Sequence, residues 1–235
     1  MSFKTEMHCH SCTVSACADI TPAQIVEKYL EHGYTTVVVA DHLSPFTFGK
    51  RYTGGEDWQE KIDYYMEGVR ALREAAAGKL HVLQGCELRI EACDSDFLVY
   101  GMTEDFMRQN PDLLQIPKVK EMCARLREAG FLVFQAHPFR NGMTVTNPDY
   151  LDGIEVYNAH ARHNSRNDIA EMWAKRYKLL PISGSDMHHD YDLPGGGILT
   201  DEPIESMEQL LRILREGRYT LVREGTPGDD DTQRK

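Results

Sequence analysis

Histidine and carboxylate residues stand close together at several points of the chain, and both residue types bind divalent metal ions. The clearest cases are residues 8–10 (HCH) and residues 186–188 (DMH), where two candidate ligands are two positions apart. Side chains alternate between the two faces of a β-strand. His8 and His10 are therefore expected to point the same way, with Cys9 on the opposite face. Two such pairs at different strand ends predict a shared metal cluster.

Further candidate ligands stand at the ends of other short apolar segments. They are Asp41, His42, Glu87, Asp96 and His137. In parallel α/β folds the carboxyl ends of the strands meet at one edge of the sheet, where active sites are built. Burying so many ionisable groups without a cation would be costly in free energy. We therefore interpret these residues as parts of a metal site rather than as polar residues of the core.

Apolar runs of strand length alternate with amphipathic stretches of helix length along the chain. Strands are expected at residues 3–10, 35–40, 80–87, 97–100, 131–136, 153–157 and 180–183. Helices are expected at residues 22–32, 56–77, 118–128, 166–178 and 206–216. This alternation predicts an α/β fold whose parallel strands are joined by right-handed crossovers. We expect one catalytic domain over residues 1–223 and a disordered polar tail over residues 224–235.

Composition limits the classes of partner. The 235 residues carry a formal net charge of −11, which would repel a long phosphate backbone, so duplex nucleic acid is not expected as a partner. A small phosphorylated substrate or a nucleotide fits better. No apolar run of about 18 residues occurs and the N-terminus lacks a signal-peptide pattern, which predicts a cytoplasmic protein without a membrane contact. The six cysteines are expected to be reduced. Oligomeric state has no signature in the sequence.

Five motifs occur in an order that resembles a known family. They are MHCHS, VVVADH, GCELRI, QAHPFR and GSDMHH, spread from about Met7 to Thr200. This series is similar to the polymerase and histidinol phosphatase (PHP) superfamily of metal-dependent phosphoesterases. The resemblance implies a distorted (β/α)7 barrel of parallel strands with the metal site at the C-terminal ends of the strands. It also implies two or three divalent ions, which would be zinc, manganese or iron.

The resemblance distributes the candidate ligands over the ions. A first ion would be bound by His8, His10, Glu87 and Asp186, and a second by Glu87, His137 and Asp96. Glu87 would bridge the two ions. Asp96 departs from the pattern, because the family usually has histidine at this position.

The third ion would be bound by His42 and His188. The family commonly supplies another ligand, aspartate or histidine, at a position that is Ala16 in this chain. Occupancy of the third site would then require Cys17, Asp19 or a water molecule as a substitute. Because Ala16 replaces a usual ligand, the sequence supports the third metal site less than the other two.

The implied activity is hydrolysis of phosphate esters, with a metal-bridging hydroxide as the nucleophile. Two divalent ions would outweigh the charges of Glu87, Asp96 and Asp186, so the site would attract anions although the whole chain is acidic. Arg140, three residues after His137, is the candidate for a catalytic contact with the phosphate. Asp41 is expected to orient a ligand without binding an ion itself.

Other interpretations remain open from the residues alone. Within the same enzyme class, the chain could be a nuclease or phosphodiesterase acting on short oligonucleotides. A different class is a non-catalytic zinc-binding or redox module built on Cys9 and Cys12, which form a single C-x-x-C motif. Because no second C-x-x-C follows and Cys9 should face away from the histidines, packing is the favoured role of Cys9.

Two loops have roles that the sequence leaves undecided. Residues 43–55 contain Phe46 and Phe48 among small polar residues, so this segment is either a substrate lid or a loop whose aromatic side chains join the core. His160 and His163 lie in a second loop and are expected to be solvated.

Overall fold

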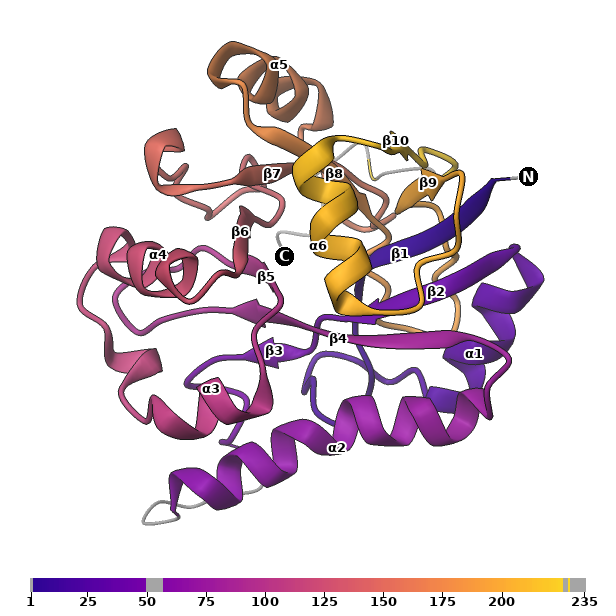
Figure 1. Ribbon diagram of the computed structural model, residues 1–235, viewed down its shortest axis with the longest axis horizontal. Helices are drawn as coiled ribbons and strands as arrows, with labels where there is room; N and C mark the ends of the chain where they lie inside the picture. The colour runs from indigo at the N-terminus through magenta and orange to yellow at the C-terminus, as the bar shows by residue number, and fades with distance from the viewer. Residues whose placement is uncertain (1, 50–56, 226–227, 229–235) are drawn as a thin grey trace.

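The computed structural model describes residues 2–49, 57–225 and 228 (Figure 1). Its strands are β1 (Phe3–Cys9), β2 (Tyr34–Val39), β3 (His42–Leu43), β4 (His81–Leu88), β5 (Phe97–Tyr100), β6 (Leu132–Gln135), β7 (Gly153–Asn158), β8 (Leu180–Gly184), β9 (Ile198–Thr200) and β10 (Thr220–Leu221). Its α-helices are α1 (Pro22–Glu31), α2 (Trp58–Ala76), α3 (Glu104–Gln109), α4 (Val119–Glu128), α5 (Asn167–Tyr177) and α6 (Met207–Glu216). Two 3₁₀ turns lie at Leu113–Gln115 and Pro148–Tyr150.

The sheet curls into a nearly closed barrel. The strand order is β10-β9-β1-β2-β4-β5-β6-β7-β8, with β3 paired to β4. The ring closes where β1 meets β8 at their carboxyl ends. There Cys9 and Met187 form a parallel bridge, and the amide of Asp186 donates to the carbonyl of His8 over 2.9 Å. Among the described residues, seven strands thus make up the ring, from β1 and β2 through β4–β8. The predicted distorted α/β barrel is confirmed.

Most neighbouring strands in the ring are parallel, but β5 runs antiparallel to both β4 and β6. The connection from β4 to β5 holds no helix, so the chain returns directly along the sheet instead of crossing over it. Because β5 is reversed, its first residues lie beside the last residues of its neighbours: Phe97 pairs with both Leu88 and Gln135. Asp96, just before β5, therefore lies at the same edge as the ligands that follow parallel strands.

The buried apolar residues form two clusters, one inside the barrel and one between the strands and the surrounding helices. Alternation along β2 sends Val38 inward while Val37 and Val39 pack outside. The inner cluster also contains Leu210 and Leu214 of α6, together with strand residues such as Leu83 and Phe134. Helix α6 lies in front of the strands in Figure 1, and its Arg215 donates to the carbonyl of Gly130, just before β6. The helix therefore covers the amino ends of the parallel strands, opposite the candidate ligands.

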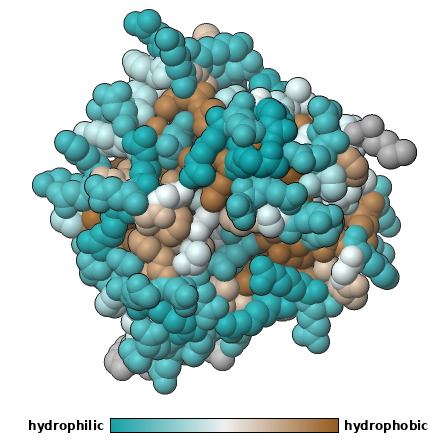
Figure 2. Space-filling model, in the orientation of Figure 1, coloured by the Kyte–Doolittle hydropathy of each residue, from teal (hydrophilic) through white to brown (hydrophobic). Residues whose placement is uncertain are grey.

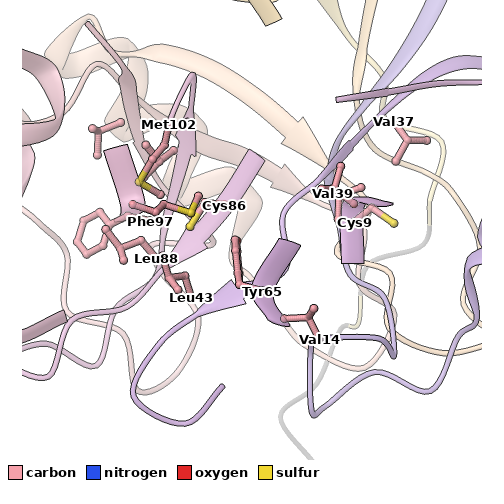
Figure 3. Close-up of a cluster of buried hydrophobic side chains, with 14 of the residues drawn as sticks. Cys9, Val14, Val37, Val39, Leu43, Tyr65, Cys86, Leu88, Phe97 and Met102 are labelled. Atoms are coloured by element: carbon pink, nitrogen blue, oxygen red, sulfur yellow. The ribbon is translucent and has the colours of Figure 1, made fainter. Parts of the chain in front are cut away.

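The outer cluster fills the space between the strands and the surrounding helices (Figure 3). Cys9 is fully buried there beside Val39. On the face drawn in Figure 2, hydrophilic residues cover most of the surface and hydrophobic ones show mainly in the hollows between them. In the described part of the chain, every helix is too short or too polar to span a bilayer.

The end of the described chain folds back on the barrel. Glu224 forms an ion pair with Lys4 over 2.6 Å, and the hydroxyl of Tyr157 donates to the carbonyl of Gly225 over 2.7 Å. The amide of Gly228 donates to the carbonyl of His160. The rest of the predicted tail, residues 226–227 and 229–235, lies outside the described residues.

Candidate metal centre

Two imidazoles and two carboxylates converge at the carboxyl edge of the barrel. The Nε2 atoms of His8 and His10 are 3.0 Å apart. Oδ1 of Asp186, which follows β8, is 3.4 Å from each of these nitrogens. Oε2 of Glu87, on β4, lies 3.3 Å from Nε2 of His8 and 3.1 Å from Nε2 of His10. All four side chains are buried, and their donor atoms are those that bind divalent transition metals.

Glu87 faces two groups of histidines at once. Its Oε1 atom is 3.1 Å from Nε2 of His137, while Oε2 is 3.0 Å from Nδ1 of His42. Oε2 is buried, and although imidazole nitrogens lie close to it, none within the described residues meets it with the geometry of a hydrogen bond. A buried carboxylate oxygen without a partner is costly, and a bound cation would remove that cost. The carboxylate is placed as a bridging ligand would be.

His42 and His188 lie on the other side of His10. Their ring centroids are 4.5 Å and 4.3 Å from that of His10, and one nitrogen of each of the three rings lies within 4.8 Å of the others. Ala16 offers no ligand atom. In the described part of the chain Cys17 belongs to no candidate ligand group, and the carboxylate of Asp19 pairs with His189 over 2.8 Å instead.

Asp96 has a partner that the sequence did not suggest. Its carboxylate lies in a group with His42 and Glu87, but both of its oxygens also accept hydrogen bonds from the guanidinium of Arg89. The distances are 2.6 Å from Nε to Oδ1 and 2.5 Å from Nη2 to Oδ2. Asp96 could therefore bind a metal ion only through a carboxylate lone pair that does not accept a hydrogen bond from Arg89.

Asp41 contacts the cluster through a serine. The hydroxyl of Ser15 donates to Oδ1 of Asp41 over 2.7 Å and lies 3.2 Å from Nδ1 of His10. The amide and hydroxyl of Ser11 also donate to the Asp41 carboxylate. This chain of contacts connects Asp41 to the ring of His10, and the expected role of Asp41 in orienting a metal ligand stays a prediction.

Arg140 is tied to a candidate ligand. Its Nη2 atom donates to Oδ2 of Asp186 over 2.6 Å, and the same oxygen accepts a hydrogen bond from Nδ2 of the Asn158 side chain over 3.1 Å. These contacts leave Oδ1 of Asp186 directed at His8 and His10. The predicted contact of Arg140 with phosphate stays a prediction.

Glu155 is a buried carboxylate on β7 that the sequence motifs did not indicate. Its Oε1 atom is 3.0 Å from Nδ1 of His8, and Oε2 accepts from the amide of His137 over 2.9 Å. Because Nδ1 of His8 faces a carboxylate, this nitrogen keeps its proton, and Nε2 is the nitrogen that would bind a metal ion after losing its own proton.

Glu6 was missed as well. It accepts hydrogen bonds from the amides of His8 and Ser185 and from the hydroxyl of Tyr29, so it joins β1 to the end of β8. The only sequence signal for either glutamate was an acidic residue inside an otherwise apolar strand.

Charges within the cluster outweigh the effect of burial. Burial alone would lower the pKa of His8 and His10 and raise that of Glu87 and Asp186. The neighbouring carboxylates instead raise the pKa of His8 well above its usual value and that of His10 to about 9. The imidazoles in turn hold the pKa of Glu87 and Asp186 well below the usual range. The carboxylates are thus ionised, and a metal ion would displace the protons held by the imidazoles.

Two candidate ligands have an unusual backbone. His137 has φ of 27° and Asp186 has φ of 52°, a region that residues other than glycine seldom adopt. Such conformations persist where the surrounding structure enforces them, most often at functional sites. The donor set, the unpaired Glu87 oxygen and this backbone together fit a site for divalent metal ions.

Two cavities adjoin the cluster. One, of about 500 Å³, is lined by His160, Arg162, Tyr191 and Leu193 among others. The other, of about 180 Å³, lies beside His42. His160 is only 4% exposed, and its ring centroid is 5.6 Å from that of His188, so the expectation of a solvated side chain was wrong. Burial lowers the pKa of His160 to about 4, which makes it a neutral imidazole at neutral pH.

The cysteines do not form a centre of their own. Cys9 is buried in the outer cluster and Cys12 is exposed, so the two thiols of the C-x-x-C motif lie in different environments. Within the described residues, every candidate ligand group consists of histidine and carboxylate alone. The geometry therefore favours packing as the role of Cys9.

Comparisons with known proteins agree with this fold. A family model described as PHP-associated matches residues 164–219, which include α5 and α6. A search of curated proteins gave no match. Among solved structures, a two-domain protein from Bacteroides vulgatus, described as containing a predicted PHP-like metal-dependent phosphoesterase, superimposes with a TM-score of 0.67 at 17% identity. The alignment covers 95% of this chain and 65% of that one, so this chain spans about two thirds of that protein.

Two further structures share the fold. PsfC from Pseudomonas syringae has a TM-score of 0.66 at 16% identity, with coverage of 96% of this chain and 92% of that one. An amidohydrolase from Chromobacterium violaceum, described with bound sulfate and no metal, has a TM-score of 0.52 at 14% identity, with coverage of 93% and 97%. The family match over residues 164–219 and the shared fold agree with the resemblance to the PHP superfamily that the motifs carry.

Proposed function

We propose that this protein is a divalent-metal-dependent phosphoesterase that hydrolyses phosphate esters of small molecules or nucleotides. The observation that carries the proposal is the convergence of His8, His10, Glu87 and Asp186 at one point of the barrel edge. The match of residues 164–219 to a PHP-associated family model adds support, as do structural neighbours described as containing a predicted PHP-like metal-dependent phosphoesterase and as an amidohydrolase.

We assign the residues to the ions as the resemblance implies. A first ion would be held by His8, His10, Glu87 and Asp186, a second by Glu87, His137 and Asp96, and a third by His42 and His188. Zinc, manganese or iron would suit these donors. When bound, such ions supply Lewis acidity and a water molecule of lowered pKa.

The other residues of the site position the ligands. Glu155 holds the proton on Nδ1 of His8 and thereby presents Nε2, and Asp41 acts on His10 through Ser15. Arg140 fixes Asp186 and is the candidate for a contact with a phosphoryl oxygen. In the overall reaction an oxygen from water bonds to phosphorus, the ester P–O bond breaks, and the departing alcohol takes up a proton.

Metal-dependent turnover of a generic ester tests the proposal. We expect protein that has been stripped with a chelator and reloaded with zinc, manganese or iron to hydrolyse 4-nitrophenyl phosphate. The variants His8→Ala and Glu87→Gln should lose bound metal and at least 100-fold of the activity. Cys12→Ser is the control, because Cys12 is exposed and belongs to no candidate ligand group in the described chain.

Other substrates separate the alternatives. Turnover of bis(4-nitrophenyl) phosphate and dinucleotides without turnover of monoesters would instead support the phosphodiesterase interpretation. Loss of metal in Cys12→Ser but not in His8→Ala would support the cysteine-based module and contradict the proposal.

A further inference from the structure

The smaller cavity beside the cluster contains a cationic side chain. Its walls include Ala16, His42, Phe46 and Arg89, and its volume is about 180 Å³. Because His42 also lies 3.0 Å from Glu87, the cavity opens directly onto the candidate metal ligands. Phe46 is 74% exposed, so it offers an apolar surface at the rim.

Arg89 is held in a fixed orientation. Asp96, itself only 2% exposed, binds the guanidinium through two parallel hydrogen bonds that use Nε and Nη2. Such bidentate pairs fix the plane of the guanidinium. The remaining nitrogen, Nη1, has no hydrogen-bond acceptor within the described residues, and the side chain is 27% exposed. A preorganised donor edge is thus left available at the cavity.

Both departures from the superfamily pattern act on this cavity. The alanine at position 16 leaves open the space where another ligand of His42's ion would stand. The aspartate at position 96 does what a neutral histidine would not: it attracts a guanidinium and anchors it beside the cluster. Ala16 and Asp96 thus replace usual metal ligands of the superfamily, and the result is an open cavity lined by a positively charged side chain.

We propose that Arg89 recognises a second anionic group of the substrate, a carboxylate or a phosphate carried by the alcohol part of the ester. This inference rests on the proposed phosphoesterase function. Guanidinium groups bind planar carboxylates and phosphates through several donors at once. With the scissile phosphate at the ions, the alcohol part would extend past His42, its carbon atoms against Phe46 and its anionic group on Arg89. Asp96 then positions Arg89 in addition to any contact with a metal.

A pair of substrates that differ in one charge tests the inference. We expect wild-type protein to have a kcat/KM at least 10-fold higher for 4-carboxyphenyl phosphate than for phenyl phosphate. Arg89→Gln should reduce this ratio to about 1, mainly through a higher KM for the carboxylated ester, and Arg89→Lys should retain part of the preference. Arg125→Gln is the matched control, because Arg125 makes a similar but exposed pair with Asp112.

Two readouts independent of turnover complete the test. Calorimetry with the metal-loaded protein should show 4-hydroxybenzoate binding at least 10-fold more weakly to Arg89→Gln than to wild type, and metal content should be equal in the two proteins. This result can be obtained even if no ester is hydrolysed, in which case the proposed function fails and the anion site stands. Equal binding of 4-hydroxybenzoate by both proteins, or loss of metal in Arg89→Gln, would overturn the inference.

Discussion

Glu155 is the residue outside the candidate ligands that most constrains them. It lies 3.0 Å from Nδ1 of His8 and also accepts from the amide of His137, so it acts on ligands from two strands. A carboxylate behind a metal-binding histidine fixes the tautomer and the ring orientation. A change at Glu155 should therefore alter the affinity for metal ions more than it alters other properties of the protein.

Glu155→Gln tests this role. An amide keeps the size of the side chain but removes the negative charge behind His8, so we expect affinity for zinc or manganese to fall about 10- to 100-fold. Competition with a chromophoric chelator measures the change. Glu208→Gln, at an exposed position of α6, should behave as wild type. Unchanged affinity in Glu155→Gln would show that the contact is structural only.

Single residues also show how far the sequence could predict the site. The alternation rule was sufficient to bring His8 and His10 together, and their Nε2 atoms are 3.0 Å apart. It could not reveal Glu155, because one acidic residue in a strand does not indicate which neighbour it meets. Nor could it reveal the Arg89–Asp96 pair or the burial of His160, since both depend on how loops fold over the barrel edge.

Among the secondary-structure elements, local signals predicted most of the fold. Thr21 caps α1 with Gln24 in a capping box, and Pro22 occupies the first turn, as their residue types indicate. The direction of β5 was not predictable in the same way. Its four apolar residues suit either direction, and the connection that reverses it carries no helix signal. The short strands β9 and β10, which pair antiparallel, gave too little pattern to be recognised.

Thr21→Ala tests the cap of α1. Loss of the side-chain hydrogen bond to the amide of Gln24 should lower the free energy of unfolding by about 1 kcal/mol. Urea unfolding measures the change, with metal present at constant concentration. Thr220→Ala, on an exposed position of β10, serves as the control. A cost as small as that of the control would mean that the cap contributes nothing measurable.

The end of β8 approaches the site so closely that only glycine fits. A Cβ atom on Gly184 would lie 2.4 Å from Cβ of His8 and 2.5 Å from Oε1 of Glu155. We expect Gly184→Ala to push these side chains aside, with a cost in unfolding free energy of about 1–3 kcal/mol and weaker metal binding. Parallel denaturant and metal titrations would measure both effects. A variant with wild-type metal affinity would contradict the close packing described for this strand end.

At the scale of the whole molecule, the candidate cluster joins strands from both ends of the chain. His8 comes from β1, Glu87 from β4 and Asp186 from the end of β8, where the barrel closes. Ions bound there would connect the first and last strands of the ring. Without ions, the buried carboxylates of Glu6, Glu87, Glu155 and Asp186 are compensated by imidazoles, hydroxyls, amides and the guanidinium of Arg140.

Metal removal should therefore destabilise the whole fold. A ligand that binds only the folded state stabilises it by about 2.7 kcal/mol at a free concentration of 100 times its Kd. We expect a chelator to lower the Tm by several degrees, and zinc or manganese to restore it. Differential scanning calorimetry checks this, with the His8→Ala variant as a control that should not respond to added metal. An equal Tm with and without chelator would argue against a shared metal site.

Anomalous X-ray diffraction from crystals soaked in zinc or manganese tests the central claim most directly. We predict anomalous peaks within about 2.0–2.3 Å of Nε2 of His8, Nε2 of His10 and the carboxylates of Glu87 and Asp186. Fully soaked crystals without a peak among these side chains, or with metal only at the cysteines, would contradict it.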